Sequence, residues 1–335
     1  MNSWLIVCLA LAALLALNTL ASVAAATLWL VLRRRVQTWP VATRARFLFA
    51  LRLSPSLAAL VAVLTLFIPA YLTYEPRPAD EVVNLKIAVM AAAATLGITL
   101  TGWRSLASWR ATRRLVTDWL IRAEKLTIDG LNLPAFRFPH SFPVLAVVGI
   151  SRPRLFIADC VMEALDEHEL AAALAHEAAH LDACDHLKLG LLRACRDVFA
   201  LLPGRQAIER AWAIEAEAAA DEHAARAGKV TALNLAAALI KVARLTPAAS
   251  KLMLPAGAYL IGEQEGGIER RVQRLLELAE RQAIPVNDFV SVNAIAWRWG
   301  IRLGWVFLAL GLFAILPHTL LAVFLLTEQF FFLLR

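Results

Sequence analysis

The chain has 335 residues, of which 60% are hydrophobic, and a net charge of +7. Soluble domains are about half apolar, so this composition excludes an ordinary soluble globular protein. The apolar residues gather toward the two ends of the chain, while the middle has the mixed composition of a soluble domain. We therefore predict membrane spans on both sides of a soluble domain.

The first part of the chain predicts three transmembrane helices. Nearly uncharged sequence covers about residues 4–32, 53–74 and 82–103, and about 20 apolar residues are enough to cross a bilayer core. The alternative for the first stretch is a cleaved signal peptide. Its basic residues, Arg33 to Arg35, follow the apolar run instead of preceding it, so we expect an uncleaved span.

Basic residues lie beside these stretches on one side of the predicted membrane. Because cytoplasmic loops carry an excess of Lys and Arg, we expect the N-terminus outside and the soluble domain in the cytoplasm. The same residues account for much of the positive charge, and no nucleic-acid-binding motif accompanies them, so we expect no nucleic-acid partner. They are Arg33, Arg34 and Arg35; Arg44, Arg46 and Arg52; and Arg104, Arg110, Arg113 and Arg114.

A further apolar stretch, Leu303 to Leu326, predicts a fourth span after the soluble region. The predicted organisation is three spans within 1–110, a cytoplasmic domain over 111–300, and the fourth span with a short tail over 301–335. The fold class that we expect is mainly α, with four transmembrane helices and an α+β domain between the third and the fourth. None of the four cysteines forms a CxxC pair, and disulfides are not expected in the cytoplasm.

Within the soluble region, a strand pair precedes a strongly helical stretch. Residues 144–148 and 155–157 are apolar and β-branched around a turn-like segment. Asp166 followed by Glu169 has the spacing of a capping box, which predicts that a helix begins there. This helix carries the sequence HEAAH, residues 176–180.

The HEAAH segment predicts a zinc site. Histidines four residues apart lie on one helix face, so His176 and His180 can occupy two corners of a zinc tetrahedron. Glu177 can then act as general base toward a water on the metal. The alternative is a pair of solvated surface histidines, but the residues around them are apolar on nearly every side. Cys184 lies too far along the same helix to converge on the ion, and we interpret it as a packed thiol.

A second helix, from about Arg205 to Ala227, supplies the predicted third ligand. Glu217 and Asp221 share one face of it, with small alanines that permit close helix packing. We predict Glu217 as the ligand, with Glu215 and Asp221 as alternatives. Asp221 can otherwise accept a hydrogen bond from a ligand histidine. Asp185 can orient a ligand histidine in the same way or bond with Lys188.

The segments 149–157, 165–170 and 176–188 together resemble the BlaR/MecR-type membrane metallopeptidases. The resemblance implies a gluzincin-like zinc domain in the cytoplasm between the third and fourth spans. It also implies a third ligand within an ExxxD pattern, which maps onto Glu217 and Asp221. Sensor members of that family carry a penicillin-binding domain after the last span. Because this sequence ends at Arg335, we expect no direct sensing of β-lactams.

The expected function is therefore a zinc-dependent endopeptidase of a bacterial inner membrane, with one zinc ion per chain. Its partners would be a protein or peptide substrate, the lipid bilayer, and a separate sensor protein or further copies of the chain. Ste24/HtpX-like peptidases, which share HExxH and ExxxD, are the second family choice and would imply quality control of membrane proteins. A signalling scaffold without proteolysis is the non-enzymatic alternative, although a structural metal site has no use for a general base.

Overall fold

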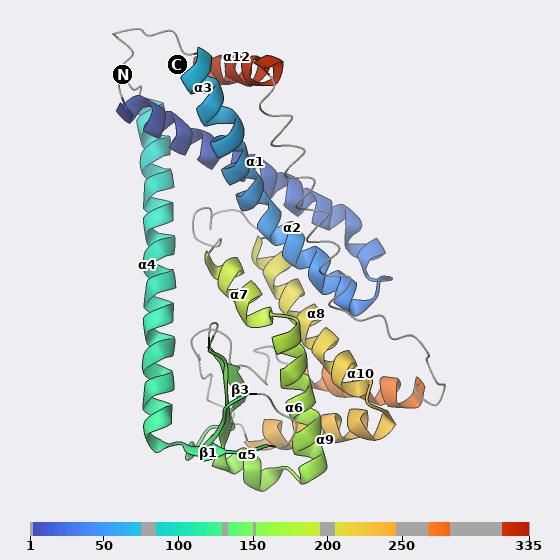
Figure 1. The fold of residues 1–335 in the computed structure, drawn as a ribbon. Coiled ribbons are helices and arrows are strands. Elements are labelled where there is room, and N and C mark those ends of the chain that lie inside the picture. The colour runs from blue at the N-terminus through green and yellow to red at the C-terminus, as the bar shows by residue number, and fades with distance from the viewer. Residues whose placement is uncertain are drawn as a thin grey trace.

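The computed structural model describes residues 3–74, 85–128, 133–149, 152–194, 205–245, 267–281 and 317–334. Helices from the first 74 residues form one end of the molecule, a small sheet with shorter helices forms the other, and the helix of residues 85–122 runs between the two ends (Figure 1). The protein is mainly α, as predicted, with one mixed sheet of four strands.

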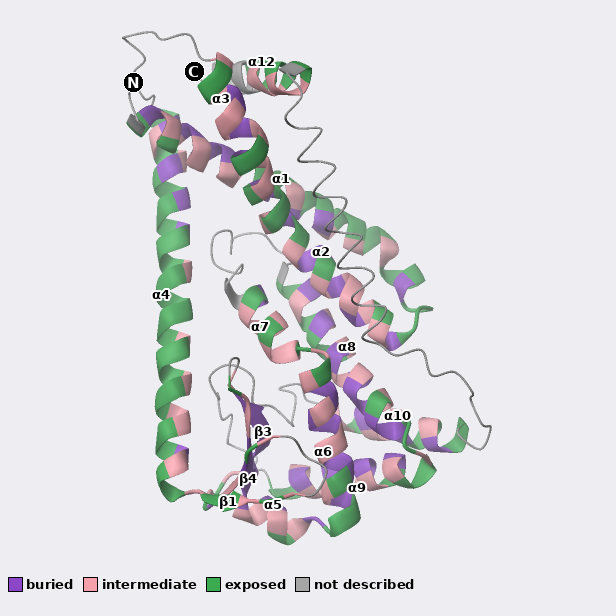
Figure 2. Cartoon of the chain, viewed as in Figure 1, coloured by how far each residue is buried: buried purple, intermediate pink, exposed green. Residues whose placement is uncertain are grey.

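Three long helical stretches agree with the three predicted N-terminal spans. They are α1 (Ser3–Val36), the continuous run of α2 (Val41–Ala62), η1 (Val63–Phe67) and α3 (Ile68–Tyr74), and α4 (Leu85–Arg122). Each is long and apolar enough to cross a membrane, and at most 28% of its most apolar window is buried within the protein. Most of α4 is coloured as exposed in Figure 2, and its exposed large apolar residues include Val89, Leu96 and Trp103. Apolar surface of this extent suits contact with lipid.

Two of the helices extend beyond the predicted spans. The second helical stretch begins at Val41, not at residue 53, and α4 ends at Arg122, well beyond residue 103. Hydropathy finds the apolar part of a helix, whereas arginines end that part without breaking the helical backbone. The predicted domain boundary at residue 110 therefore falls inside α4.

The structure describes only the second half of the fourth predicted span. Residues 301–316 lie outside the described residues, and α12 (Pro317–Leu334) follows them. This helix packs beside α3 and η1, with the rings of Tyr74 and Phe324 6.1 Å apart. A fourth crossing of the membrane therefore stays a prediction.

The sheet has the strand order β1-β2-β4-β3. β3 and β4 form the predicted antiparallel pair, in which Leu145 lies opposite Ile157. The sequence pattern did not predict β1 or β2. Trp119, near the end of α4, packs against Phe138 and Phe156, with ring centroids 4.7 and 5.1 Å apart, and so anchors α4 to the sheet. The strands are β1 (Glu124–Leu126), β2 (Ala135–Phe138), β3 (Leu145–Val148) and β4 (Arg154–Ala158).

Among the described residues, further helices pack on the sheet and build the site, with α5 in contact with β4 and α6 in contact with β3. α6 packs against α8 and α9, α10 packs against both α9 and α8, and α8 also contacts α2. Buried alanines on α8 permit the close packing predicted for it. The helices are α5 (Asp159–Ala164), α6 (Glu167–Asp182), α7 (Asp185–Ala194), α8 (Arg205–Ala225), α9 (Lys229–Leu245) and α10 (Gly267–Arg281).

The region after HEAAH differs from the prediction. The expected helix ends at Asp182, and α7 begins as a separate helix at Asp185. Cys184 lies in the turn between them with a positive φ of 56°. Its side chain is exposed, so the prediction of a packed thiol is wrong. The reason is the turn itself, which takes Cys184 off the face of α6.

Candidate metal centre

The capping box predicted from Asp166 and Glu169 fixes the start of α6. The Asp166 carboxylate accepts the Glu169 backbone N–H at 2.9 Å, and the Glu169 carboxylate accepts the Asp166 N–H at 2.9 Å. Lys241 of α9 also pairs with Glu169. α6 thereby starts at a defined residue, which sets the direction of its later side chains.

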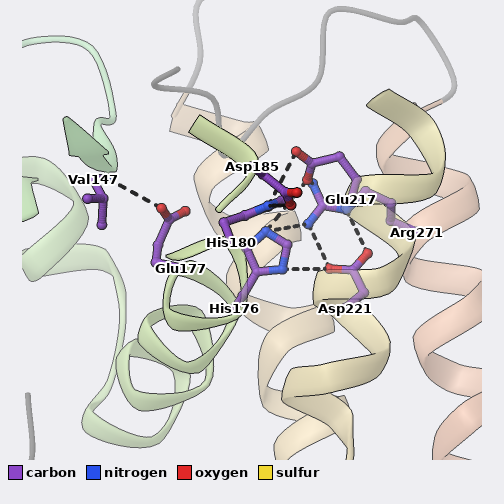
Figure 3. A network of polar contacts seen from close by, with 8 residues as sticks. All are labelled: Val147, His176, Glu177, His180, Asp185, Glu217, Asp221 and Arg271. Carbon is purple, nitrogen blue, oxygen red and sulfur yellow. Dashed lines mark hydrogen bonds and ion pairs between the residues drawn. The ribbon is translucent and has the colours of Figure 1, made fainter. Parts of the chain in front are cut away.

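His176, His180 and Glu217 come together where α6 crosses α8 (Figure 3). Glu217 presents one oxygen to each histidine, with Oε2 3.5 Å from His176 Nε2 and Oε1 3.6 Å from His180 Nε2. Both histidines are buried, and the Glu217 side chain is 23% exposed. Glu215, the alternative ligand, instead pairs with Arg44 of α2 at 3.0 Å.

This donor set fits a tetrahedral metal ion. Zinc holds nitrogen and oxygen ligands at about 2.0–2.2 Å, which places pairs of donor atoms roughly 3.3–3.6 Å apart. The Nε2–Oε separations at the site have that size. His180 Nε2 is buried and has no hydrogen-bond partner among the described residues, so it is available to a metal ion. Two imidazoles and a carboxylate suit zinc and also other first-row divalent ions.

A carboxylate lies behind each of the two histidines. Asp221 Oδ1 is 3.0 Å from His176 Nδ1, a close ion-pair contact that lies off the ideal direction of the ring N–H bond. Asp185 Oδ2 is 2.9 Å from His180 Nδ1. With the proton on Nδ1, each ring turns the lone pair of its other nitrogen toward Glu217. Carboxylates placed in this way orient imidazoles and make them more basic ligands.

The turn at Ala183 and Cys184 explains how Asp185 reaches His180. Five residues along one continuous helix would place the two side chains on different faces. The break between α6 and α7 brings Asp185 back against His180 instead. Lys188 donates to the other oxygen of Asp185 at 2.9 Å, so both interactions weighed for Asp185 from the sequence occur together.

Arg271 of α10 is a member of the site that the sequence analysis missed. Its guanidinium donates to both oxygens of Asp221, each at 2.8 Å, and its Nη1 lies 2.9 Å from Glu217 Oε2. Its Nη2 is 3.3 Å from His176 Nε2. A signal for it exists, because Arg271, Leu275 and Ala279 are spaced four residues apart and share the buried stripe of α10. A cation on such a stripe indicates a buried anionic partner.

The electrostatics of the cluster follow from this pairing. Burial by itself would raise the pKa of Glu217, but the charges of Arg271 and His180 hold it well below its ordinary value. Burial would lower the pKa of His180, but Glu217 and Asp185 raise it well above its ordinary value. The carboxylates are therefore ionised and attract positive charge, including that of a metal ion.

Glu177 follows the first histidine but points away from the cluster, toward β3 (Figure 3). Its Oε2 accepts the Val147 backbone N–H at 3.4 Å. Burial raises the pKa of this carboxyl. A carboxylate with raised basicity is suited to proton transfer. In the structure it is turned toward Val147 and away from His176 and His180.

The site opens into a cavity of about 620 Å³. Glu177, His180 and Glu217 line one end of it, and α7, α8 and α10 contribute the remaining walls among the described residues. Two further histidines of the helical region differ in position, because His186 lines the cavity, while His223 is exposed and does not.

Comparison with known proteins gives no family model that matches the chain and no matching curated protein. The site geometry therefore carries the functional argument.

Removal of the carboxylate behind His180 is expected to weaken zinc binding. Asp185→Ala leaves the ring free to rotate and less basic, so we expect a loss of about 10–100-fold in affinity. Titration of the purified protein against a zinc chelator measures this loss. Asp182→Ala is the matched control, because Asp182 is exposed at the end of α6, the helix that carries His180. Equal affinity in the two variants would contradict the role of Asp185.

Replacement of Arg271 by Met is expected to destabilise the zinc-free protein more than the zinc-loaded protein. The variant leaves Glu217 and Asp221 without their buried counter-charge, a defect of about 3–5 kcal/mol, and zinc binding supplies part of the missing positive charge. Thermal unfolding with and without zinc should therefore show a larger zinc-induced rise for Arg271→Met than for wild type. The exposed neighbour Arg270→Met serves as control. An unchanged rise in Arg271→Met would show that Arg271 does not share the charge of the site.

Proposed function

We propose that this protein is an integral-membrane zinc endopeptidase. The observation that carries the proposal is the convergence of His176, His180 and Glu217 beside a cavity that Glu177 also lines. Two histidines and a glutamate leave a fourth position open on a tetrahedral ion, which is the arrangement of catalytic zinc sites. A purely structural site would use all four positions.

In this proposal, side chains of the protein orient the metal ligands and transfer a proton. Zinc supplies a Lewis acid for the scissile carbonyl and lowers the pKa of the attacking water. Glu177 accepts the proton from that water and delivers it to the leaving amine. Asp221 and Asp185 hold the two imidazoles in one orientation while this occurs. In this proposal, a substrate segment that approaches the edge strand β3 would replace the contact between Glu177 and the Val147 N–H.

The position of the site supports cleavage close to a membrane. α8, which carries Glu217, packs through Ile208 and Trp212 against Leu48 and Leu51 of α2. The helix that carries Glu217 therefore lies against a candidate membrane helix (Figure 1). In this proposal the arginine-rich ends of the candidate membrane helices lie inside the cell. The N-terminus then lies outside the bacterial inner membrane, and the scissile bond is reached from the cytoplasm.

The same features favour regulatory proteolysis of the BlaR/MecR type. The order of apolar helices followed by a helical domain with the metal site supports this resemblance. α8 contacts the membrane helix α2 and also carries Glu217. A separate sensor protein or a second copy of the chain would then act through the membrane helices. Quality control of membrane proteins, in the manner of HtpX-like peptidases, is distinguished by a broad range of substrates.

Glu177→Gln is expected to abolish proteolysis while zinc remains bound. The amide cannot accept a proton, and loss of a general base costs about 10²–10⁴-fold in rate. The uncut substrate should accumulate in cells that express Glu177→Gln and not in cells that express wild type, as comparison of their proteomes would measure. The zinc content of the two purified proteins should be equal. Glu167→Gln, exposed at the start of the same helix, is the control. Full proteolysis by Glu177→Gln would contradict the mechanism, and bound zinc without any Glu177-dependent cleavage would favour the scaffold.

A further inference from the structure

The second half of α4 is strongly basic and continues without a break from a candidate membrane span. Its first half is mostly apolar, whereas residues 103–122 contain five arginines and a single acidic residue, Asp118. Arg110, Arg113 and Arg114 are all exposed. Clustered basic residues directly beyond a span attract anionic lipid headgroups, so this part of α4 is a candidate lipid-binding surface.

The charges of these three arginines are not neutralised within the fold. Neither Arg110 nor Arg114 forms an ion pair with any described residue. The Arg113 guanidinium lies over the ring of Trp109, with Cζ 4.7 Å from the ring centroid. A cation placed over a ring keeps the N–H groups at its edge for an acceptor. Arg104, by contrast, already has a contact of its own.

The basic face of α4 points away from the metal-site domain. Trp119 packs against the sheet from the opposite side of the helix. Arg110 and Arg114 are one turn apart and share a face with Trp103, whose side chain is 67% exposed. Figure 2 shows this part of α4 mostly as exposed surface. The domain therefore leaves the face open to a ligand.

Trp103 marks the level at which α4 leaves the bilayer core. The stretch from Leu85 to Trp103 rises about 27 Å, close to the core thickness of about 30 Å. Tryptophan also favours the level of the lipid headgroups. Trp109, one and a half turns further along, is 52% exposed as well. The arginines that follow Trp103 therefore lie at or just beyond the headgroup layer.

The direction of α4 brings the arginine side chains back toward the membrane. Helix side chains lean toward the N-terminus, which in α4 is the apolar half, and Arg113 shows this lean by covering Trp109. Arg110 and Arg114 lie about 10 and 16 Å beyond Trp103 along the axis, and a lean of one turn reduces these distances to about 5 and 11 Å. The headgroup layer is about 5–7 Å deep, and charges act over a further Debye length of about 8 Å.

We propose that Arg110, Arg113 and Arg114 form a binding site for the phosphate groups of anionic phospholipids in the membrane that α4 crosses. The occupant is a lipid because the arginines follow the span on one continuous helix and lean toward the headgroups. Arginine binds phosphate through two parallel N–H bonds, so one headgroup can bridge Arg110 and Arg114. The site depends on neither the metal centre nor proteolysis. Since Trp119 joins α4 to the sheet, bound lipid would hold the metal-site domain at the membrane surface.

Native mass spectrometry of the full-length protein tests this site. Detergent-solubilised protein receives equal amounts of phosphatidylglycerol and phosphatidylcholine with the same acyl chains. We expect wild type to retain phosphatidylglycerol in preference by about fivefold or more, as one arginine at the headgroup level provides. In Arg110→Gln/Arg113→Gln/Arg114→Gln this ratio should fall at least fivefold relative to wild type. A wild type without preference, or a triple variant that keeps the wild-type ratio, would overturn the proposal.

A matched triple variant separates the site from total charge. Arg226→Gln/Lys229→Gln/Arg244→Gln removes three exposed cations at and beyond the end of α8 and on α9, and it should keep the wild-type ratio. An equal fall in this control would mean that net charge, not α4, determines the preference. A wild-type dimer that the α4 variant abolishes and that added lipid leaves unchanged would mean that a second copy covers the face. Either result would overturn the lipid site.

Salt provides a test in wild type that requires no variant to fold. Raising ammonium acetate from 0.1 to 1 M shortens the Debye length from about 10 to about 3 Å. The preference for phosphatidylglycerol should then decrease, because the three arginines are exposed. A ratio that does not change with salt would contradict recognition by charge.

Discussion

Carboxylate charge held away from water is the constraint on which the site depends. Asp221 is fully buried, Glu177 nearly so, and Glu217 is largely enclosed. An unpaired carboxylate in such surroundings costs several kcal/mol, so each requires a positive partner or a strong donor. Arg271 supplies one charge to Asp221 and Glu217 together. The two histidine nitrogens that face Glu217 lie beside this anion, where a divalent cation can take the place of the protons that the raised pKa values of the two rings favour.

The arrangement of helices follows from meeting this requirement. α6 brings the histidines, α8 brings Glu217 and Asp221, and α10 must pack close enough to both for Arg271 to reach across. The turn after Asp182 returns Asp185 to His180. α8 also packs against α2 and is tied to it by Glu215 and Arg44, so the helix that carries Glu217 is in direct contact with a candidate membrane helix.

Features encoded by local spacing could be predicted from the sequence. HEAAH, the capping box at Asp166 and the four-residue step from Glu217 to Asp221 depend on helical periodicity, and the structure brings these residues together. Arg271 could not be placed in the same way, because its contacts cross about 50 residues of chain. β1 and β2 are too short for a periodic signal. The turn at Cys184 brings Asp185 back to His180, a contact that no local pattern of apolar residues encodes.

The zinc X-ray absorption spectrum of the purified, zinc-loaded protein tests the central claim most directly. The account predicts a shell of nitrogen and oxygen donors at about 2.0–2.2 Å, with the outer scattering of two imidazoles and no sulfur. Because Glu217 contributes an oxygen, Glu217→Ala should lose a light-atom donor or exchange it for water. Sulfur at about 2.3 Å, as the exposed Cys184 would give, or a shell of water oxygens without imidazole would contradict the assignment of His176, His180 and Glu217 as the metal centre.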